Sequence, residues 1–292
     1  MIDGGLSTQL EARGAVIEGS LWTGRVLIEH PEVVEAAHRD FVEAGAEIII
    51  TSSYQVAVEG FLEVGLTEAQ AKQALRESVR VARRAVAGTS VKVAASVGPY
   101  GAILHDGSEY RGDYRVDEAF LKDFHRRRLE VILTERPDLL AIETIPTLSE
   151  VRALAAVIRD WPEIPFWVSM SCRSETELVS GESIADAVQV LAGLPGLLAI
   201  GANCVAPENV EGIAHTIRSV ADIPVIAYPN RGGEWDADRG AWEGHTPHSL
   251  AEWWPTWHAA GVQYVGGCCG LGAPAIAELA QVVHRDRVTP VV

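Results

Sequence analysis

Short apolar segments alternate with amphipathic helical patterns along the whole chain. Most of the apolar segments carry β-branched residues at consecutive positions, which is typical of parallel strands covered on both faces. The stretches between them repeat apolar residues three and four positions apart, as helices that pack on a sheet do. The predicted strands are Ile2-Asp3, Ile48–Thr51, Val91–Val97, Leu139–Glu143, Phe166–Cys172, Leu197–Cys204, Val225–Tyr228 and Gln263–Gly267.

The predicted helices carry start signals in the sequence. Pro31 opens the first of them, since proline is favoured in the first turn of a helix. Thr67 with Gln70 reads as a capping box, in which each side chain bonds the backbone N–H of the other residue. Thr147 with Glu150 has the same spacing and predicts the same device.

Eight predicted strands in alternation with roughly eight helices indicate an α/β fold, a (β/α)₈ TIM barrel that forms one domain over residues 1–292. A doubly wound open sheet is the alternative, although no Gly-x-Gly-x-x-Gly turn follows the first strand. Residues 98–115 and 229–247 form long connections that contain glycine and aromatic residues. Connections of this length in a compact domain are usually functional or mobile.

The charge of the chain limits its partners. With 24 basic and 40 acidic residues, the net charge is −16 when histidine is neutral, which argues against a nucleic-acid partner. Apolar runs stay shorter than a membrane span, and Asp3 stands where a signal peptide would carry a basic residue. We therefore expect a cytoplasmic protein without a membrane partner, as a monomer or a small homo-oligomer.

Polar residues follow the apolar runs where the predicted strands end. In a barrel the catalytic groups lie at this carboxyl-terminal face. Two carboxylates and three of the four cysteines are among these residues, which is the strongest indication of a site. The strand-end residues are Asp3, Thr51, Glu143, Asn203, Cys204, Tyr228, Cys268 and Cys269.

The adjacent Cys268 and Cys269 point to the same target only where their strand has ended, because successive side chains on a strand alternate between faces. Gly267 and Gly270 permit such a turn. Metal ligation, buried thiols and a redox pair all remain open from spacing alone. Together with Cys204, three thiolates would leave zinc an open fourth position, and an all-sulfur site is favoured because no histidine ends a strand beside these cysteines.

Other readings of the same segments are simpler. The stretch Gly266–Gly272 before a helix could hold a phosphate, although it contains neither lysine nor arginine. Cys172 alone is expected to be a small buried hydrophobe. The tract Arg126–Arg128 lies in a helical pattern with acidic neighbours and is expected to form a solvated face.

Three separated motifs resemble the homocysteine S-methyltransferase family across residues 2 to about 283. These are Asp3-Gly4-Gly5-x-x-Thr8-x-Leu10, Gly201-x-Asn203-Cys204 and Gly266-Gly267-Cys268-Cys269-Gly270. Further segments are similar to the subgroup that uses S-methylmethionine. These are Ser20-Leu21-Trp22, Ser96–Gly101, Gly107–Tyr114 and Tyr228-Pro229-Asn230.

The resemblance implies roles for individual residues. Cys204, Cys268 and Cys269 would bind Zn²⁺. Asp3 and Glu143 would hold the amino group of homocysteine, in a pocket that Gly4, Thr51 and Asn203 also line. An aromatic wall would attract a cationic methyl donor. The candidate residues of this donor pocket are Trp22, Tyr54, Tyr110, Tyr114, Tyr228 and Asn230.

The reaction implied is zinc-dependent transfer of a methyl group from S-methylmethionine, with S-adenosylmethionine as a second candidate donor, to the thiol of L-homocysteine, which yields methionine. Betaine as donor, selenocysteine as acceptor, and a zinc-holding or redox protein without turnover are the alternatives. The two strand-end carboxylates argue against the last of these, because holding zinc requires thiolates and no carboxylate pair.

Overall fold

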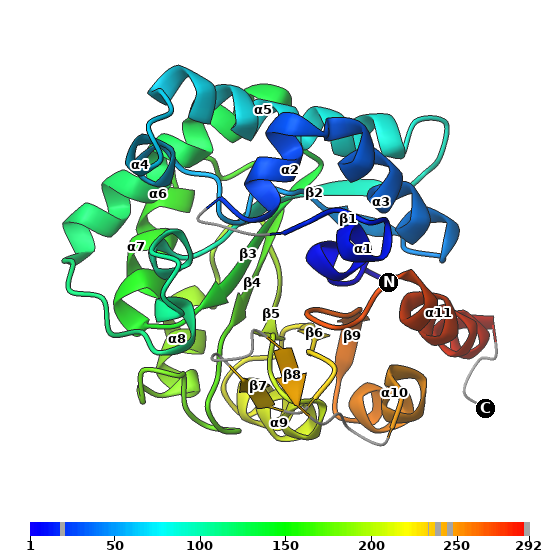
Figure 1. The fold of residues 1–292 in the computed structure, drawn as a ribbon. Coiled ribbons are helices and arrows are strands. Elements are labelled where there is room, and N and C mark those ends of the chain that lie inside the picture. Colours follow the sequence, from blue (N-terminus) through cyan, green and yellow to red (C-terminus); the bar gives the residue numbers. More distant parts are fainter. Residues whose placement is uncertain (18–20, 233, 237–240, 244–247, 289–292) are drawn as a thin grey trace.

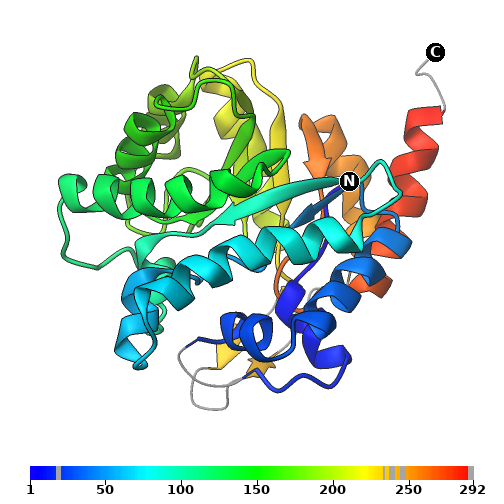
Figure 2. The same ribbon diagram turned by 90° about the horizontal axis from the view of Figure 1, so that it is seen from above.

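Seven parallel strands form a curled sheet, and helices cover its outer side (Figures 1 and 2). The computed structural model describes all residues except 18–20, 233, 237–240, 244–247 and 289–292, so Ser20 lies outside the described residues. The strands of the sheet are β1 (Ile48–Ile50), β2 (Lys92–Val97), β3 (Leu139–Ile145), β4 (Phe166–Met170), β5 (Leu197–Asn203), β6 (Val225–Tyr228) and β9 (Val262–Val265).

Helices precede, separate and follow these strands in the alternation that the sequence predicts. They are α1 (Leu6–Ala12), α2 (Thr23–Glu29), α3 (Pro31–Glu43), α4 (Val58–Glu63), α5 (Glu68–Ala85), α6 (Glu118–Ile132), α7 (Leu148–Ile158), α8 (Ile184–Leu191), α9 (Val210–Val220), α10 (Leu250–Ala259) and α11 (Ala273–Val288). None of the helices formed by the described residues is long and apolar enough to cross a membrane.

The strands lie in the sheet in their chain order, β1-β2-β3-β4-β5-β6-β9, and every pair is parallel. A doubly wound sheet would reverse its strand order at a switch point. The consecutive order therefore excludes that alternative and agrees with a barrel-like arrangement.

The expected closure by eight strands is wrong in one respect, because Ile2-Asp3 is not a strand of this sheet. Ile2 makes a single parallel bridge to Ile48, and its N–H donates to the carbonyl oxygen of Val265 at 2.9 Å. One residue later the ladder ends, because the Asp3 side chain accepts the N–H of Ile50 at 2.8 Å. The Asp3 side chain thus accepts a hydrogen bond that a backbone carbonyl would accept in a continued strand. Residues Ile2-Asp3 therefore join β1 and β9 without forming a full strand.

A small apolar cluster lies on the inner face of the curled sheet, and the larger apolar layer lies between sheet and helices. Trp167 is 1% exposed and occupies much of the interior, where its indole N–H donates to the Tyr228 hydroxyl at 3.1 Å. The other inner residues include Ile2, Ala94, Leu139, Ala141, Ala199 and Ile226.

The two predicted capping boxes differ. At the start of α5, Thr67 and Gln70 form the complete reciprocal box. At the start of α7, the Thr147 hydroxyl accepts the N–H of Glu150 at 3.1 Å, but the Glu150 side chain does not return the bond. That carboxylate is fully buried and bonds His125 Nε2 at 2.7 Å instead. The second box is therefore only half formed.

The Glu150 carboxylate also holds the connection after β2. This connection contains the short 3₁₀ helices η1 (Tyr100–Ile103) and η2 (Ser108–Tyr110). The N–H of Tyr100 donates to Glu150 Oε1 at 2.7 Å, and the Tyr114 hydroxyl also donates to Glu150. In the connection after β6, the strands β7 (Glu234–Asp236) and β8 (Ala241–Glu243) pair in antiparallel fashion.

The expectation of a solvated arginine face holds for Arg126 and fails for Arg128. Arg126 is exposed and pairs with Asp160. Arg128 is 2% exposed and donates to the carbonyl oxygens of Gly98 at 2.7 Å, Ser53 at 3.1 Å and Tyr54 at 3.1 Å. It faces inward because α6 turns this position toward the ends of β1 and β2. Burial lowers the pKa of its guanidinium to about 10.

Candidate functional site

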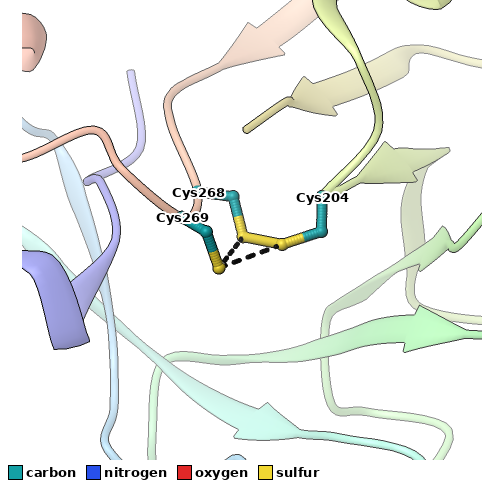
Figure 3. Close-up of side chains that lie close together, drawn as sticks. All are labelled: Cys204, Cys268 and Cys269. Carbon is teal, nitrogen blue, oxygen red and sulfur yellow. Dashed lines mark hydrogen bonds between the residues drawn. A yellow bond between two sulfur atoms is a disulfide. The ribbon is translucent and has the colours of Figure 1, made fainter. Parts of the chain in front are cut away.

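Three cysteine side chains meet where β5 and β9 end (Figure 3). Cys204 follows β5, and Cys268 and Cys269 lie in the turn after β9. Cys204 and Cys268 are joined in a disulfide. The Cys269 sulfur lies 3.5 Å from that of Cys204 and 4.0 Å from that of Cys268. The predicted convergence of these three residues is present in the structure.

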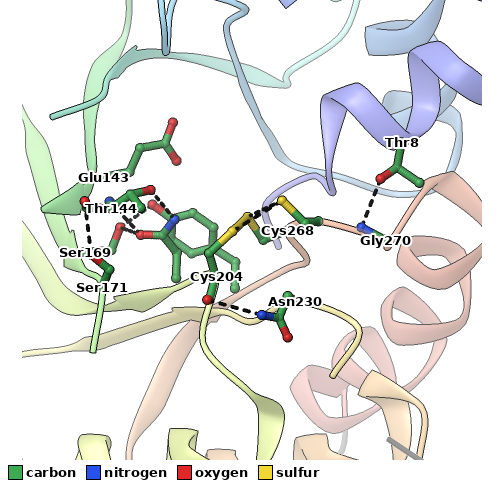
Figure 4. Close-up of a disulfide and its surroundings, with 12 residues drawn as sticks. Thr8, Glu143, Thr144, Ser169, Ser171, Cys204, Asn230, Cys268 and Gly270 are labelled. Atoms are coloured by element: carbon green, nitrogen blue, oxygen red, sulfur yellow. Dashed lines mark hydrogen bonds between the residues drawn. A yellow bond between two sulfur atoms is a disulfide. The ribbon is translucent and has the colours of Figure 1, made fainter. Parts of the chain in front are cut away.

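Backbone hydrogen bonds fix both cysteine turns to the end of β6. The N–H of Cys204 donates to Tyr228 O at 3.1 Å, and that of Cys268 donates to Pro229 O at 2.8 Å. The Asn230 amide donates to Cys204 O at 3.2 Å (Figure 4). Gly270 has φ +80° and turns the chain away after the second cysteine of the pair, as glycine readily does.

The cluster fits a thiolate-bound metal. Zinc–sulfur bonds of about 2.3 Å in a tetrahedron put sulfur atoms roughly 3.8 Å apart, and Cys269 lies at comparable distances from both partners. Burial raises the pKa of the Cys269 thiol to about 11, so a neighbouring cation is needed to hold a thiolate there. The disulfide must be reduced before Cys204 and Cys268 can both act as ligands.

A phosphate site in the glycine-rich stretch Gly266–Gly272 does not fit the structure. Such a site needs free backbone N–H groups. Here the N–H groups of residues 266, 267, 268 and 271 donate to backbone carbonyls, and that of residue 270 donates to the Thr8 hydroxyl at 3.0 Å. Cys172, expected to be a small buried hydrophobe, is partly buried and packs against the hydrophobic core, outside the three-cysteine cluster. Burial raises the pKa of its thiol to about 12.

Asp3 is a buried carboxylate with one oxygen unpartnered. It is 2% exposed, and its Oδ2 accepts the N–H of Ile50. Its Oδ1 is buried with no hydrogen-bond partner. Burial raises the pKa of Asp3 well above its usual range, and the charge of Glu143 raises it further. A buried oxygen of this kind can accept a hydrogen bond from a cationic ligand.

Glu143 lies on β3 and faces the same cavity as the cysteines. The Ser96 hydroxyl donates to its Oε1, and the Tyr228 hydroxyl also interacts with it. Burial raises the pKa of Glu143 to about 7, against the lowering effect of these two hydroxyl groups. A cation in the cavity would favour the ionised form.

The remaining predicted pocket residues lie near these groups but differ in what their side chains do. A Cβ at Gly4 would lie 2.4 Å from the carbonyl oxygen of Leu271, so the close approach there requires glycine. The Thr51 hydroxyl accepts the N–H of Ser96 at 3.0 Å. The Asn203 amide bonds within the protein. All three predicted residues line the cavity.

Four of the six predicted donor-pocket residues line the cavity, namely Trp22, Tyr54, Tyr110 and Tyr228. Tyr110 is 45% exposed, and its hydroxyl interacts with the Cys269 thiol. Tyr114 and Asn230 do not belong to the lining. Tyr114 bonds Glu150, and Asn230 supports the Cys204 turn.

Sequence reasoning missed Ser96, Thr144 and Ser169. Thr144 lines the cavity, and the two serines are fully buried and bond the residues that do. Ser96 stands in a motif shared with the S-methylmethionine subgroup, and Thr144 directly follows Glu143. Only proximity to these residues could have pointed to them, and nothing in the sequence marks Ser169.

Fold and site together define a barrel-like α/β protein with three cysteines that could hold a metal ion and two buried carboxyl groups at its strand ends. A family model described as homocysteine S-methyltransferase matches residues 1–283. The chain belongs to this family.

Two relatives and one solved structure illustrate the similarity. Homocysteine S-methyltransferase of Escherichia coli (strain K12) is 42% identical over 290 residues, covering 96% of this chain and 93% of that protein. Homocysteine S-methyltransferase YbgG of Bacillus subtilis (strain 168) is 35% identical over 301 residues, covering 99% and 96%. The crystal structure of the homocysteine methyltransferase MmuM from Escherichia coli in its metallated form has a TM-score of 0.86 at 40% identity, covering 96% of this chain and 94% of that one.

Proposed function

We propose that this protein transfers a methyl group from S-methylmethionine to the sulfur of L-homocysteine, forming two molecules of methionine. The observation that carries the proposal is the convergence of three cysteines with Glu143 on one cavity, beside the buried Asp3. Homocysteine has a thiol at one end and an ammonium group at the other, and the cavity offers a matching group for each.

Zn²⁺ is the metal that we propose for the reduced cluster, with Cys204, Cys268 and Cys269 as its ligands. Three sulfur donors and no histidine suit zinc among the common protein metals. When bound, zinc supplies a Lewis acid that keeps a thiol deprotonated near neutral pH. The cytoplasm, where we propose that the protein acts, is a reducing compartment that favours free thiols.

Asp3 and Glu143 hold the ammonium group of homocysteine in this proposal. The unpartnered Oδ1 of Asp3 gains a donor, and the ammonium charge relieves the repulsion between the two carboxylates. Both groups then ionise more readily, since an opposite charge lowers the pKa of a carboxyl group. Gly4 and Thr51 shape the wall beside them.

The aromatic residues of the cavity face the methyl donor. Trp22, Tyr54, Tyr110 and Tyr228 offer rings to a sulfonium, and each cation–π contact contributes about 0.5–2 kcal/mol. The donor leaves as a neutral thioether, so the reaction needs no general acid. In-line positioning of the two substrates therefore provides most of the rate. Tyr114 and Asn230 act from outside the lining, by holding the connection after β2 and the Cys204 turn.

Residues 1–292 act as one homocysteine-binding domain in this proposal, as a monomer or a small homo-oligomer with small-molecule substrates. The test is a methionine-formation assay on reduced, zinc-loaded protein, with homocysteine and one donor at a time. S-methylmethionine should support turnover, with S-adenosylmethionine as a second donor. Activity with betaine alone would show that betaine, not S-methylmethionine, is the methyl donor. Faster turnover with selenocysteine than with homocysteine would show that selenocysteine is the acceptor. If no pair of substrates gave turnover, the protein would instead be a zinc-holding or redox protein.

A further inference from the structure

The Asn203 amide is committed to the protein. Its Oδ1 accepts the N–H of Thr144 at 2.8 Å and the Ser169 hydroxyl at 2.8 Å. Its Nδ2 donates to the Thr144 hydroxyl at 2.7 Å. Asn203 is 1% exposed, and three of its four hydrogen-bonding positions are used in this way. A side chain so occupied is better suited to positioning other groups than to binding substrate.

Thr144 needs such support because its backbone is strained. Its φ is +61°, in the left-handed region that β-branched residues avoid. The pairing of β3 with β4 also shifts here: Ile142 pairs with Val168, but Ile145 pairs with Met170. Glu143 and Thr144 therefore form a bulge, and bulges of this kind aim a side chain at a site.

The Asn203 side chain reaches from β5 across β4 to β3, and Ser169 on β4 bonds it on the way. Figure 4 shows Thr144 and Ser169 beside Glu143, with Cys204 next to them. Thr144 directly follows Glu143, and Asn203 directly precedes Cys204. One clamp therefore joins the neighbours of the proposed ammonium-binding carboxylate and of a metal-ligating sulfur.

We propose that Asn203 and Thr144 are positioning residues whose clamp sets the spacing between Glu143 and Cys204, and so selects an acceptor with the thiol-to-ammonium span of homocysteine. This inference rests on the proposed function of the site. Two strained positions support it, because Cys204, with φ +50°, also lies in the left-handed region. The clamp joins Thr144, near the end of β3, to β5, which directly precedes Cys204.

The test is a double-mutant cycle of Asn203→Ala and Thr144→Gly on reduced, zinc-loaded protein. Asn203→Ala should raise the KM for homocysteine at least tenfold, because Thr144 relaxes and Glu143 shifts. Glycine adopts φ +61° without strain. Adding Thr144→Gly should therefore recover at least threefold of that loss. The KM for the methyl donor should stay within about twofold throughout.

Thr144→Val provides a second route should Asn203→Ala fold poorly, as judged by its melting temperature. It keeps the branched shape and removes only the hydroxyl that Asn203 Nδ2 bonds, and the homocysteine KM should rise about fivefold. An Asn203→Ala loss that Thr144→Gly does not repair, or an equal rise in both KM values, would overturn the clamp. Glu143→Gln separates the two proposals: an unchanged homocysteine KM there would overturn the ammonium contact itself.

Discussion

Asp3 and Glu143 are two buried carboxyl groups that repel each other, and the charge of Glu143 adds to the effect of burial in raising the pKa of Asp3. Burial favours the neutral form of each carboxyl group, and in the proposed function both gain from a bound ammonium group. In that proposal, binding strength is obtained at the expense of the stability of the free protein, as is common where charges are held for a ligand.

Glu143→Gln should therefore stabilise the ligand-free protein while weakening homocysteine binding. The pKa of Glu143 is about 7 in the folded state, against 4.5 as its ordinary value. Between these values the folded state keeps a proton that the unfolded state releases, so the free energy of unfolding falls as pH rises. The variant should recover up to about 3 kcal/mol at pH 8. Urea denaturation at pH 5 and pH 8 measures this, with the exposed Glu163→Gln as control; equal pH profiles for wild type and Glu143→Gln would contradict it.

For His38 we expect the opposite pH dependence of the free energy of unfolding. It is fully buried on α3, both ring nitrogens lack a partner, and burial lowers its pKa from 6.5 to about 4. Between these values only the unfolded state binds the proton, so stability is lost as pH falls. His38→Leu should remove about 2 kcal/mol of the difference between pH 8 and pH 5. Urea denaturation at several pH values measures this for His38→Leu and for the control His30→Leu, whose side chain is exposed. If the free energy of unfolding changed with pH to the same extent in both variants, His38 would not be the cause of the pH dependence.

Arg128 and Arg126 form a matched pair within one tract. Arg128→Met removes the donor to three backbone carbonyls at the ends of β1 and β2, and should lower the free energy of unfolding by at least about 3 kcal/mol. Arg126→Met breaks an exposed ion pair and should change it by less than about 1 kcal/mol. Chemical denaturation measures both, and comparable losses would show that burial does not distinguish them.

Cys268 and Cys172 provide the matched pair for the metal. Cys268→Ala should reduce the zinc content of the reduced protein from one ion per chain to a small fraction and abolish methyl transfer, because two thiolates bind zinc far less tightly than three. Cys172→Ala should retain both the bound zinc and the methyl-transfer activity. Metal analysis after reduction and dialysis is the measurement. Full zinc in Cys268→Ala would remove that ligand from the proposed site.

How much could be predicted depended on whether a signal was local. The Thr67–Gln70 box needed only its own turn, and it formed in full. Glu150 carried the same local signal, but His125 and the connection after β2 competed for its carboxylate. Arg128 likewise read as a surface residue, because a tract of three arginines does not reveal which one a helix turns inward.

The sequence by itself determined the alternation of strands and helices, the chain order of the sheet, and the meeting of three cysteines at the strand ends. Apolar periodicity and strand-end polarity are enough for this, since parallel strands place their carboxyl ends together. Tertiary structure alone decided that the segment Ile2-Asp3 makes a single bridge and no full strand, and that Asn203 bonds Thr144 instead of facing the cavity freely. Both depend on which hydrogen-bonding partner is nearest in space, and residues 59 positions apart in the chain give no sign of that.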